Sequence, residues 1–202
     1  MNQIIKRLFD LIVSILFLLF TLPFLLLIAV VIKLDSPGPV LFRGRRVGRG
    51  GKEFEILKFR TMVEDPALVG PALTSKSDLR ITRVGKFLRH YKLDEIPQLL
   101  NVIRGEMSLV GPRPEDPKYV EHYTREQRKA LSVLPGIASS AAVKFRHEED
   151  FLAEVEAEEL ERVYLTEVLP AKLALDLEYV ENQSLLLDIR ILYGAVTAVL
   201  KS

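Results

Sequence analysis

The residues best suited to chemistry lie in one short stretch, LDEIPQ at residues 93–98. Proline is tolerated in the first turn of a helix, so Pro97 predicts a helix start and puts Asp94 at or near its N-cap. The free N–H groups and the helix dipole would favour an ionised carboxylate there and could bind phosphate beside it. Such a carboxylate is a candidate nucleophile that forms an aspartyl-phosphate. An N-cap aspartate is also an ordinary helix feature, so a purely structural role stays open.

Basic residues surround this stretch in the sequence. Arg89 lies five residues upstream, and GPRP at residues 111–114 holds Arg113 between two prolines that stiffen the backbone. A pre-ordered arginine suits bidentate binding of an anion. Residues 43–62 carry seven Lys or Arg and only two acidic residues, a basic strip that includes Lys58 and Arg60. The strip is consistent with phosphate binding and with an anchor to anionic lipid.

Other kinds of site lack their sequence signals. The chain has no cysteine, which excludes disulfides, thiolate zinc sites and a cysteine nucleophile. Its three histidines have no ligand spacing, and no G-x-S-x-G motif occurs. The GRGG stretch at residues 48–51 lacks the frame of a nucleotide-binding glycine loop. No zinc-finger or helix-turn-helix signature points to nucleic acid, and we expect none as a partner.

Acidic residues gather in the C-terminal half. Residues 146–181 carry twelve acidic and three basic residues, and the run from 148 to 161 predicts a solvated helix face. Asp188 differs, because it lies inside the apolar run LLLDI. A carboxylate in such surroundings usually pairs with a cation or a metal ion.

A long apolar segment precedes all of these residues. Leu11–Ile32 contains no charged residue and is long enough to cross a bilayer, and mean hydropathy over the whole chain is +0.17. It is too long for a signal-peptide core and lacks a cleavage site. Basic residues flank both ends, which places both flanks in the cytoplasm. Pro23, near the middle, interrupts helix hydrogen bonding, and Thr21 could bond the freed backbone. A re-entrant hairpin and a kinked spanning helix both remain open from these features alone.

The remaining pattern predicts a mainly α fold with a small β-hairpin, in the α+β class. We expect short strands at 40–42 and 54–59 around a turn at 43–51, and a loop at 66–78. Helical spacing covers 84–91 and 96–103, with Gly105 as a stop. A capping box at 124–127 predicts a helix to 131. A helical region at 148–180 is interrupted by Pro170, and Ser184 caps a last helix to 200, which is either core or lies on the bilayer.

Four motifs stand in a recognisable order: LDSPGPV at 34–40, KFRTM at 58–62, LDEIPQLLNV at 93–102 and MSLVGPRP at 107–114. With them the chain resembles the bacterial sugar transferases, the small monotopic phosphoglycosyl transferases, from its N-terminus to near its C-terminus. The resemblance implies a re-entrant membrane hairpin at 1–34, broken at Pro23. It also implies a catalytic domain at 35–202, with amphipathic interfacial helices, on the cytoplasmic face of the bacterial inner membrane.

The same resemblance implies a reaction and its partners. A UDP-sugar would donate sugar-1-phosphate to a polyprenol phosphate, expected to be undecaprenyl phosphate, with release of UMP, as the first membrane step of glycoconjugate assembly. The expected partners are these two substrates and membrane lipid, with a second copy of the chain as a further candidate.

The resemblance also assigns residues. The catalytic dyad falls on Asp94, the nucleophile, and Glu95. Arg89 and Arg113 would face the nucleotide and phosphates, with Lys58 and Asp176 as further substrate-binding residues. Mg²⁺ is the implied cofactor, because attack of a carboxylate on a diphosphate needs its charge neutralised. Its candidate ligands are Asp94, Glu95 and Asp188.

Some stretches depart from the family pattern. LPGIAS at 134–139 replaces a common R-P-G-I-T-G, GRR at 44–46 replaces Q-x-R, and 143–149 lacks a frequent N-G-R. These changes leave the sugar undefined. Two other functions remain open: a non-catalytic membrane adaptor in which Asp94 is a cap, and a phosphatase in which an aspartyl phosphate is transferred to water.

Overall fold

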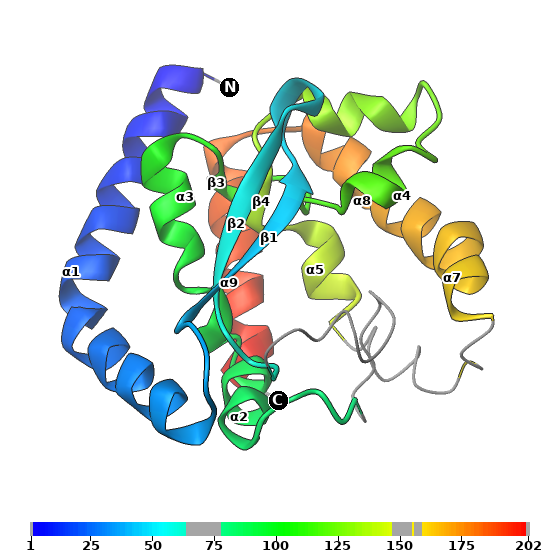
Figure 1. The fold of residues 1–202 in the computed structure, drawn as a ribbon. Helices are drawn as coiled ribbons and strands as arrows, with labels where there is room; N and C mark the ends of the chain where they lie inside the picture. Colours follow the sequence, from blue (N-terminus) through cyan, green and yellow to red (C-terminus); the bar gives the residue numbers. More distant parts are fainter. Residues whose placement is uncertain (1, 64–77, 147–154, 156–158, 201–202) are drawn as a thin grey trace.

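The computed structural model describes residues 2–63, 78–146, 155 and 159–200. This part of the chain is mostly helical, with two small two-stranded sheets. The long helix α1 (Gln3–Asp35) runs along one side of the molecule, and the helices at 117–120 and 160–163 lie on the opposite side, beyond the sheets (Figure 1). The predicted α+β class, mainly helical with a β-hairpin, is confirmed.

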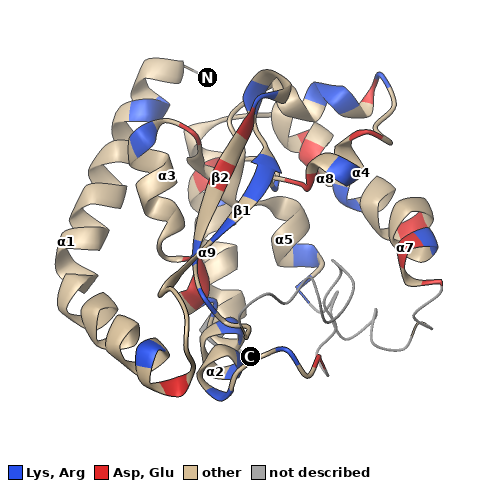
Figure 2. Cartoon of the chain, viewed as in Figure 1, with Lys and Arg blue, Asp and Glu red and all other residues tan. Residues whose placement is uncertain are grey.

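Helix α1 is the one described helix that is long and apolar enough to cross a membrane. Charged residues lie at its two ends and leave its long middle uncharged (Figure 2). The helix is bent (Figure 1), and Pro23 within it removes one backbone hydrogen bond and accounts for a kink. The Thr21 hydroxyl donates to the carbonyl of Phe17 at 2.7 Å. It therefore does not serve the carbonyl of Leu19, which the proline deprives of its donor.

The N-terminal half of α1 is attached to the rest of the fold by polar contacts. Lys6 Nζ lies 2.7 Å from Asp188 Oδ2, and both side chains are buried. The Ser108 hydroxyl donates to Asp10 Oδ2 at 2.7 Å. Buried polar groups need such partners, because burial without them is costly. These contacts fix the position of α1 on the fold.

The other end of α1 is held by Arg60. This residue was expected in a basic strip that binds phosphate or anionic lipid, but it is only 6% exposed. Its guanidinium donates to the carbonyl oxygens of Ile32, Ser36 and Pro37, at the last turn of α1 and just beyond it. The last carbonyls of a helix lack donors, and a cation there is favoured by the helix dipole. Arg60 therefore acts as a C-terminal cap, and its assignment to the strip was wrong.

Strands β1 (Leu41–Val47) and β2 (Glu53–Phe59) form the predicted antiparallel hairpin. The turn is shorter than predicted, because the strand continues through the basic residues 43–46. Arg43 and Arg45 lie 3.5 and 3.3 Å from Glu55 and Glu53 on the neighbouring strand, and all four side chains are exposed. Opposite charges on neighbouring strands support their pairing. Gly50, with φ of 69°, makes the turn that closes the hairpin.

Helices α2 (Arg83–His90) and α3 (Gln98–Arg104) confirm the predicted helical stretches. Gly105 ends α3 with φ of 83°, as predicted. Gly85 lets α2 approach the backbone after β2, because a Cβ there would lie 2.1 Å from the Thr61 carbonyl oxygen. The short strands β3 (Ser108–Val110) and β4 (Gly136–Ala138) then pair in parallel.

The C-terminal half is helical. Short helices α4 (Pro117–Val120) and α5 (Ser140–Lys144) precede α7 (Leu160–Val163), which continues through a π-helical turn at 164–168 into α8 (Leu169–Glu181). Pro170 lies in the first turn of α8, so the irregularity falls just before it. The predicted capping box is present, because the Thr124 N–H donates to Gln127 and the Gln127 N–H to the Thr124 hydroxyl, but the helix that follows is a 3₁₀ helix, Gln127–Ser132.

The last helix, α9 (Leu185–Leu200), is capped by Ser184 as predicted, since the Leu187 N–H donates to its hydroxyl. Of its two expected locations, the structure confirms core packing for one face, and the other face is exposed. Asp188 and Ile191 are buried, whereas an apolar stripe remains exposed at Leu186, Ile189, Tyr193 and Val196. The predicted loop at 66–78 lies outside the described residues except at Asp78, and the acidic run at 148–161 lies outside them except at 155 and 159–161.

Candidate active site

Asp94 lies in a 3₁₀ turn, Leu93–Glu95, that precedes α3. The chain enters this turn through Lys92 in the left-handed region, with φ of 53°. Ile96 and Pro97 separate the turn from α3, and Pro97 provides no side-chain cap. The prediction that Asp94 caps the following helix was therefore wrong, because the additional turn moves the carboxylate away from the helix N-terminus.

The Asp94 carboxylate is buried without full compensation. The residue is 6% exposed, and its Oδ1 makes no hydrogen bond with any residue that the structure describes. An unpaired carboxylate oxygen in the interior is destabilising, so such atoms are rare in folded proteins. The capping role that would have explained an aspartate here is absent. The unpartnered oxygen marks Asp94 as a candidate for ligand binding or catalysis.

Glu95, next in sequence, is held by two cations from different parts of the fold. Its Oε1 accepts from Lys58 Nζ of β2 at 2.8 Å and from Arg113 Nη2, in the loop after β3, at 3.3 Å. The structure therefore brings together three of the predicted site residues, which lie on three separate segments. Two cations on one carboxylate oxygen form an anchored group of charges beside Asp94.

The two neighbouring carboxyl groups are shifted in opposite directions. Burial raises the pKa of Asp94, although the charges of Lys58, Lys92 and Arg89 oppose this rise. Burial would also raise the pKa of Glu95, but Lys58 and Arg113, with Lys92, outweigh it and lower that pKa below its usual range. Helix N–H groups were expected to favour ionised Asp94, and the position of Asp94 removes that effect. Of the two carboxyl groups, Glu95 is the one that its neighbouring cations keep ionised. The Asp94 carboxylate is weakly solvated because it is buried.

The loop that carries Arg113 is fixed by strand β4. Gly111 donates its N–H to the Ala138 carbonyl at 3.1 Å, and Gly136 donates to the Pro112 carbonyl at 2.9 Å. The two backbones approach so closely that a Cβ on Gly136 would lie 2.0 Å from the Gly111 nitrogen. Only glycine permits this approach. Residues 134–139, noted for their departure from the family pattern, thus include the strand that supports Arg113.

Asn101 is a positioning residue that the sequence reading missed. It is fully buried in α3, and its Oδ1 accepts from the Leu57 N–H of β2 at 3.0 Å. Its Nδ2 donates to the Glu55 carbonyl and to Glu106 Oε2, each at 2.7 Å. This side chain ties the strand that carries Lys58 to the helix that follows the Asp94 turn. An asparagine among the apolar positions of a predicted helix was the available signal.

Asp176 of α8 lies behind the Arg113 loop. It is 3% exposed, accepts a hydrogen bond from the backbone N–H of Arg113, and its Oδ1 has no partner among the described residues. Burial raises the pKa of Asp176 to about 7, against the opposing charges of Lys172 and Arg113. Its described contact is thus with the backbone of a site residue. A second group nearby also escaped the sequence reading: Tyr164 donates to Glu115 Oε2 at 2.6 Å, and Lys172 donates to the Tyr164 hydroxyl at 3.3 Å.

Replacing Asp176 with Asn should change how stability depends on pH. The folded state binds a proton at Asp176 up to about pH 7, whereas the unfolded chain loses it near pH 4, so this group lowers stability as pH rises between them. Asn does not titrate, so Asp176→Asn should gain stability relative to the native protein by up to about 1.4 kcal/mol per pH unit in that range. Melting temperatures in detergent from pH 5 to 8 measure this difference. The exposed Glu178→Gln on the same helix is the control, and a pH-independent difference for Asp176→Asn would contradict the assignment.

Asp188 has protein partners. Lys6 Nζ lies 2.7 Å from its Oδ2, the Tyr179 hydroxyl donates to its Oδ1 at 2.7 Å, and the residue is fully buried. Of the two partners predicted for this carboxylate, a cation or a metal ion, the structure provides the cation. The geometry gives Asp188 a role in fastening α1 to α9.

The available carboxylates fit a metal ion that the substrate also binds better than an ion enclosed by protein ligands alone. Among the described residues, no group of three or more Asp, Glu or His side chains is placed to hold a metal. Mg²⁺ is commonly bound through one or two carboxylates, with water and substrate phosphates completing its shell. Asp94 has an unpartnered oxygen, and the carboxylate of the adjacent Glu95 is already contacted by Lys58 and Arg113, so the pair offers at most two ligands. The residues present therefore fit Mg²⁺ that arrives with a phosphate-bearing substrate.

Comparison with known proteins gives consistent matches. The family model described as "Bacterial sugar transferase" matches residues 1–202. An exopolysaccharide production protein of Rhizobium leguminosarum bv. phaseoli is 39% identical over 98% of this chain and 96% of its own length. A UDP-glucose:undecaprenyl-phosphate glucose-1-phosphate transferase of Caulobacter vibrioides is 40% identical over 96% of this chain and 69% of its own length.

A third relative is much longer than this chain. It is a UDP-N-acetylgalactosamine-undecaprenyl-phosphate N-acetylgalactosaminephosphotransferase of Aeromonas hydrophila, 36% identical over 97% of this chain but only 44% of its own length. The matched portion in each relative includes the segments that carry Lys58, the Asp94–Glu95 pair and Arg113. The full-length family match and these identities lead to one conclusion: the chain belongs to the bacterial sugar transferase family and is an enzyme of the phosphotransferase type.

Proposed function

We propose that this enzyme transfers sugar-1-phosphate from a UDP-sugar to a polyprenol phosphate, with undecaprenyl phosphate as the natural acceptor, through a covalent intermediate on Asp94. The names of the relatives support the two substrates. The observation that carries the mechanism is the buried Asp94 Oδ1, which has no hydrogen-bond partner among the described residues and lies beside an anchored cluster of cations. A weakly solvated carboxylate is a better nucleophile than one surrounded by water.

The reaction divides into two displacements at the same phosphorus. An Asp94 oxygen attacks the β-phosphorus of the UDP-sugar, the bond from that phosphorus to the bridging oxygen breaks, and UMP leaves with the bonding electron pair. A phosphate oxygen of the polyprenol phosphate then attacks the phosphorus, and the bond to Asp94 breaks. The products are a polyprenyl diphosphate sugar and the regenerated carboxylate, so no oxidant, reductant or water is consumed.

The surrounding residues have separate tasks in this scheme. Both substrates and the nucleophile are anionic, so attack needs positive charge close to the phosphates. Lys58 and Arg113, held in place by Glu95, and Arg89 from the last turn of α2 provide that charge. Mg²⁺ bound by Asp94 and Glu95 together with the diphosphate would add further charge neutralisation. Asp176 and β4 hold the loop that carries Arg113, and Asn101 ties the strand that carries Lys58 to α3.

A panel of UDP-sugars tests the proposal directly. With the correct donor and no acceptor, the enzyme should release UMP once per active site, and polyprenol phosphate should then allow continued turnover. Continued release of UMP without acceptor would indicate transfer to water and thus a phosphatase. A chain that released UMP from no UDP-sugar, with or without acceptor, would be the membrane adaptor instead.

The membrane arrangement belongs to the same proposal. Both ends of α1 contact the globular part of the chain: Lys6 through Asp188 near one end, and Ile32 through Arg60 at the other. Two ends attached to one body lie on one side of a membrane, which favours the re-entrant hairpin at 1–34 over a spanning helix. Together with the basic flanks, this supports a monotopic protein, with the domain at 35–202 on the cytoplasmic face of the inner membrane, where the acceptor phosphate is available.

Cysteine labelling tests this topology, because the chain contains no native cysteine. Single cysteines at Asn2 and at Lys52, in the hairpin turn, should both resist a membrane-impermeant reagent in intact cells and both react after lysis. Restoring the helix hydrogen bond with Pro23→Leu should straighten α1 and shift part of the population towards spanning. Reaction of Asn2→Cys alone in intact cells of the otherwise native protein would exclude the re-entrant arrangement.

A further inference from the structure

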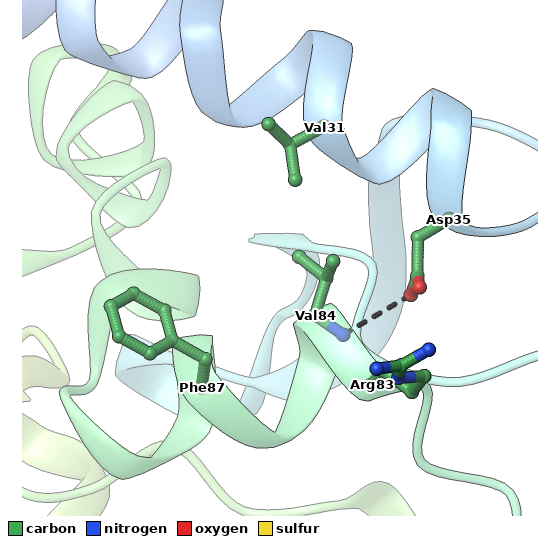
Figure 3. A pocket seen from close by; sticks show the side chains of 5 residues that line it. All are labelled: Val31, Asp35, Arg83, Val84 and Phe87. Carbon is green, nitrogen blue, oxygen red and sulfur yellow. Dashed lines mark hydrogen bonds between the residues drawn. The ribbon is translucent and has the colours of Figure 1, made fainter.

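A groove lies between the last turns of α1 and helix α2, outside the cluster around Glu95. Its volume is about 460 Å³, and five residues line it: Val31, Asp35, Arg83, Val84 and Phe87. Figure 3 shows Val31 on α1 facing Val84 and Phe87 on α2 across the space, with Asp35 and Arg83 together at one end. The volume is within the range of small-molecule sites.

The walls of the groove are apolar and incompletely covered. Val31 is 38% exposed and Phe87 is 57% exposed. Beside them, Ile28, Ile32 and Leu88 form a buried cluster that fixes the spacing between α1 and α2. The groove therefore does not depend on a ligand to hold its walls apart. Its exposed apolar surface favours an apolar occupant.

The polar end of the groove is already engaged within the protein. Asp35 Oδ2 accepts from the Val84 N–H at 3.2 Å, and the Thr82 hydroxyl accepts from the Gly85 N–H at 3.0 Å. These bonds satisfy donors of the first turn of α2, so that helix end is not an open anion site. The carboxylate of Asp35 also disfavours a second anion nearby. An apolar chain that lies on Val84 and Phe87 has its natural exit along α1, where Leu27 and Val30 are exposed.

The position of α2 connects the groove to the catalytic turn. The helix passes from Arg83, at the groove, to His90, and the Asp94 turn follows directly. Its eight residues cover about 12 Å. Leu93 of that turn packs against the same buried cluster as Ile28 and Ile32. A molecule with a phosphate at the Asp94 turn and an apolar chain along α2 would therefore occupy both places.

From this arrangement we propose that the groove between α1 and α2 binds the isoprenoid chain of the polyprenol phosphate acceptor, and thereby guides its phosphate to Asp94. This inference rests on the proposed function for the identity of the acceptor. It assigns acceptor recognition to Val31, Val84 and Phe87. An acyl chain of the surrounding bilayer is the competing occupant, and the test distinguishes the two.

The first test separates the two half-reactions. Val31→Trp should fill the groove and Phe87→Ala should remove one wall, and each should raise the KM for long-chain polyprenol phosphate about tenfold. The burst of UMP from UDP-sugar alone should remain as in the native enzyme, which also demonstrates correct folding. Leu26→Trp, at an exposed α1 position that does not line the groove, is the matched control and should change neither measurement. Equal acceptor KM values for all four proteins would overturn the proposal.

The second test does not depend on turnover. A photoreactive benzoylphenylalanine in place of Phe87 should crosslink to polyprenol phosphate in vesicles of phosphatidylglycerol and phosphatidylethanolamine, and unlabelled polyprenol phosphate should compete. Crosslinks to bulk lipid alone, with no competition by polyprenol phosphate, would assign the groove to the bilayer and reject the inference. If the native enzyme gave no UMP burst but this crosslink were competed, the covalent mechanism would fail while the groove assignment stood.

Discussion

Replacing Asp94 with Asn should abolish both the covalent adduct and turnover, lowering kcat by about 10⁴-fold or more. The amide cannot attack phosphorus, and the loss of one essential nucleophile removes the whole double displacement. Folding should survive, because Asn has nearly the same shape and Asp94 Oδ1 makes no hydrogen bond with a described residue that would be lost. Mass spectrometry after incubation with UDP-sugar alone should find the added sugar phosphate on the peptide 93–104 of the native enzyme and not of Asp94→Asn.

The matched control for this experiment is Asp116→Asn. Asp116 is the N-cap of α4, lies 3.1 Å from Arg46 and is not among the residues that contact Glu95, so its replacement should leave turnover close to that of the native enzyme. An Asp94→Asn enzyme that remained active without deamidation, or an adduct on another residue, would exclude Asp94 as the nucleophile. A single displacement would give no adduct and no UMP before the acceptor was added.

Removal of Mg²⁺ should have an effect of similar size. Excess EDTA should stop turnover and added Mg²⁺ should restore it, because an anionic nucleophile must approach an anionic diphosphate. Since Asp94 and Glu95 offer only two carboxylates, the ion should bind weakly to the enzyme alone and more tightly together with a UDP-sugar or UDP. Titration calorimetry of the native enzyme with and without UDP, which has no sugar phosphate to transfer, measures this difference.

Two results would contradict the proposed role of Mg²⁺. Full turnover in excess EDTA would remove Mg²⁺ from the proposal. Tight, saturable binding of Mg²⁺ in the absence of nucleotide would mean that the protein encloses the ion with more ligands than this pair. In that case Asp188→Asn should be compared with Lys6→Met, because both variants break the same ion pair but only the first removes a carboxylate.

Local signals allowed much of the fold to be predicted from the sequence. Gly105 ends α3 in a left-handed conformation, Ser184 caps α9, and Thr124 and Gln127 form a capping box. Each of these features depends on residues within a few positions of one another, where the rules of helix termini apply. The hairpin was predicted for the same reason, although its first strand continues through residues 43–46, where acids on the neighbouring strand compensate the charges of Arg43 and Arg45.

Features that depend on distant contacts could not be predicted in this way. Arg60 looked like one of several basic residues until the end of α1 was placed against it. The N-cap expected for Asp94 was replaced by a 3₁₀ turn, and burial then raised the pKa that the helix was expected to lower. The family resemblance pointed to Lys58, Glu95 and Arg113 as site residues, but only the fold could show that one carboxylate oxygen joins all three.

The ion pair between Lys6 and Asp188 also bears on how the protein is made. Its partners are separated by 182 positions in the sequence. At the usual rate of translation, about 10–40 s pass between the synthesis of one and of the other. During that interval Lys6 lacks the carboxylate of Asp188, and its acidic neighbour on α1 is Asp10, 4.0 Å from its Nζ. This ion pair therefore forms only after α9 has left the ribosome, so the contact between α1 and α9 is completed late in synthesis.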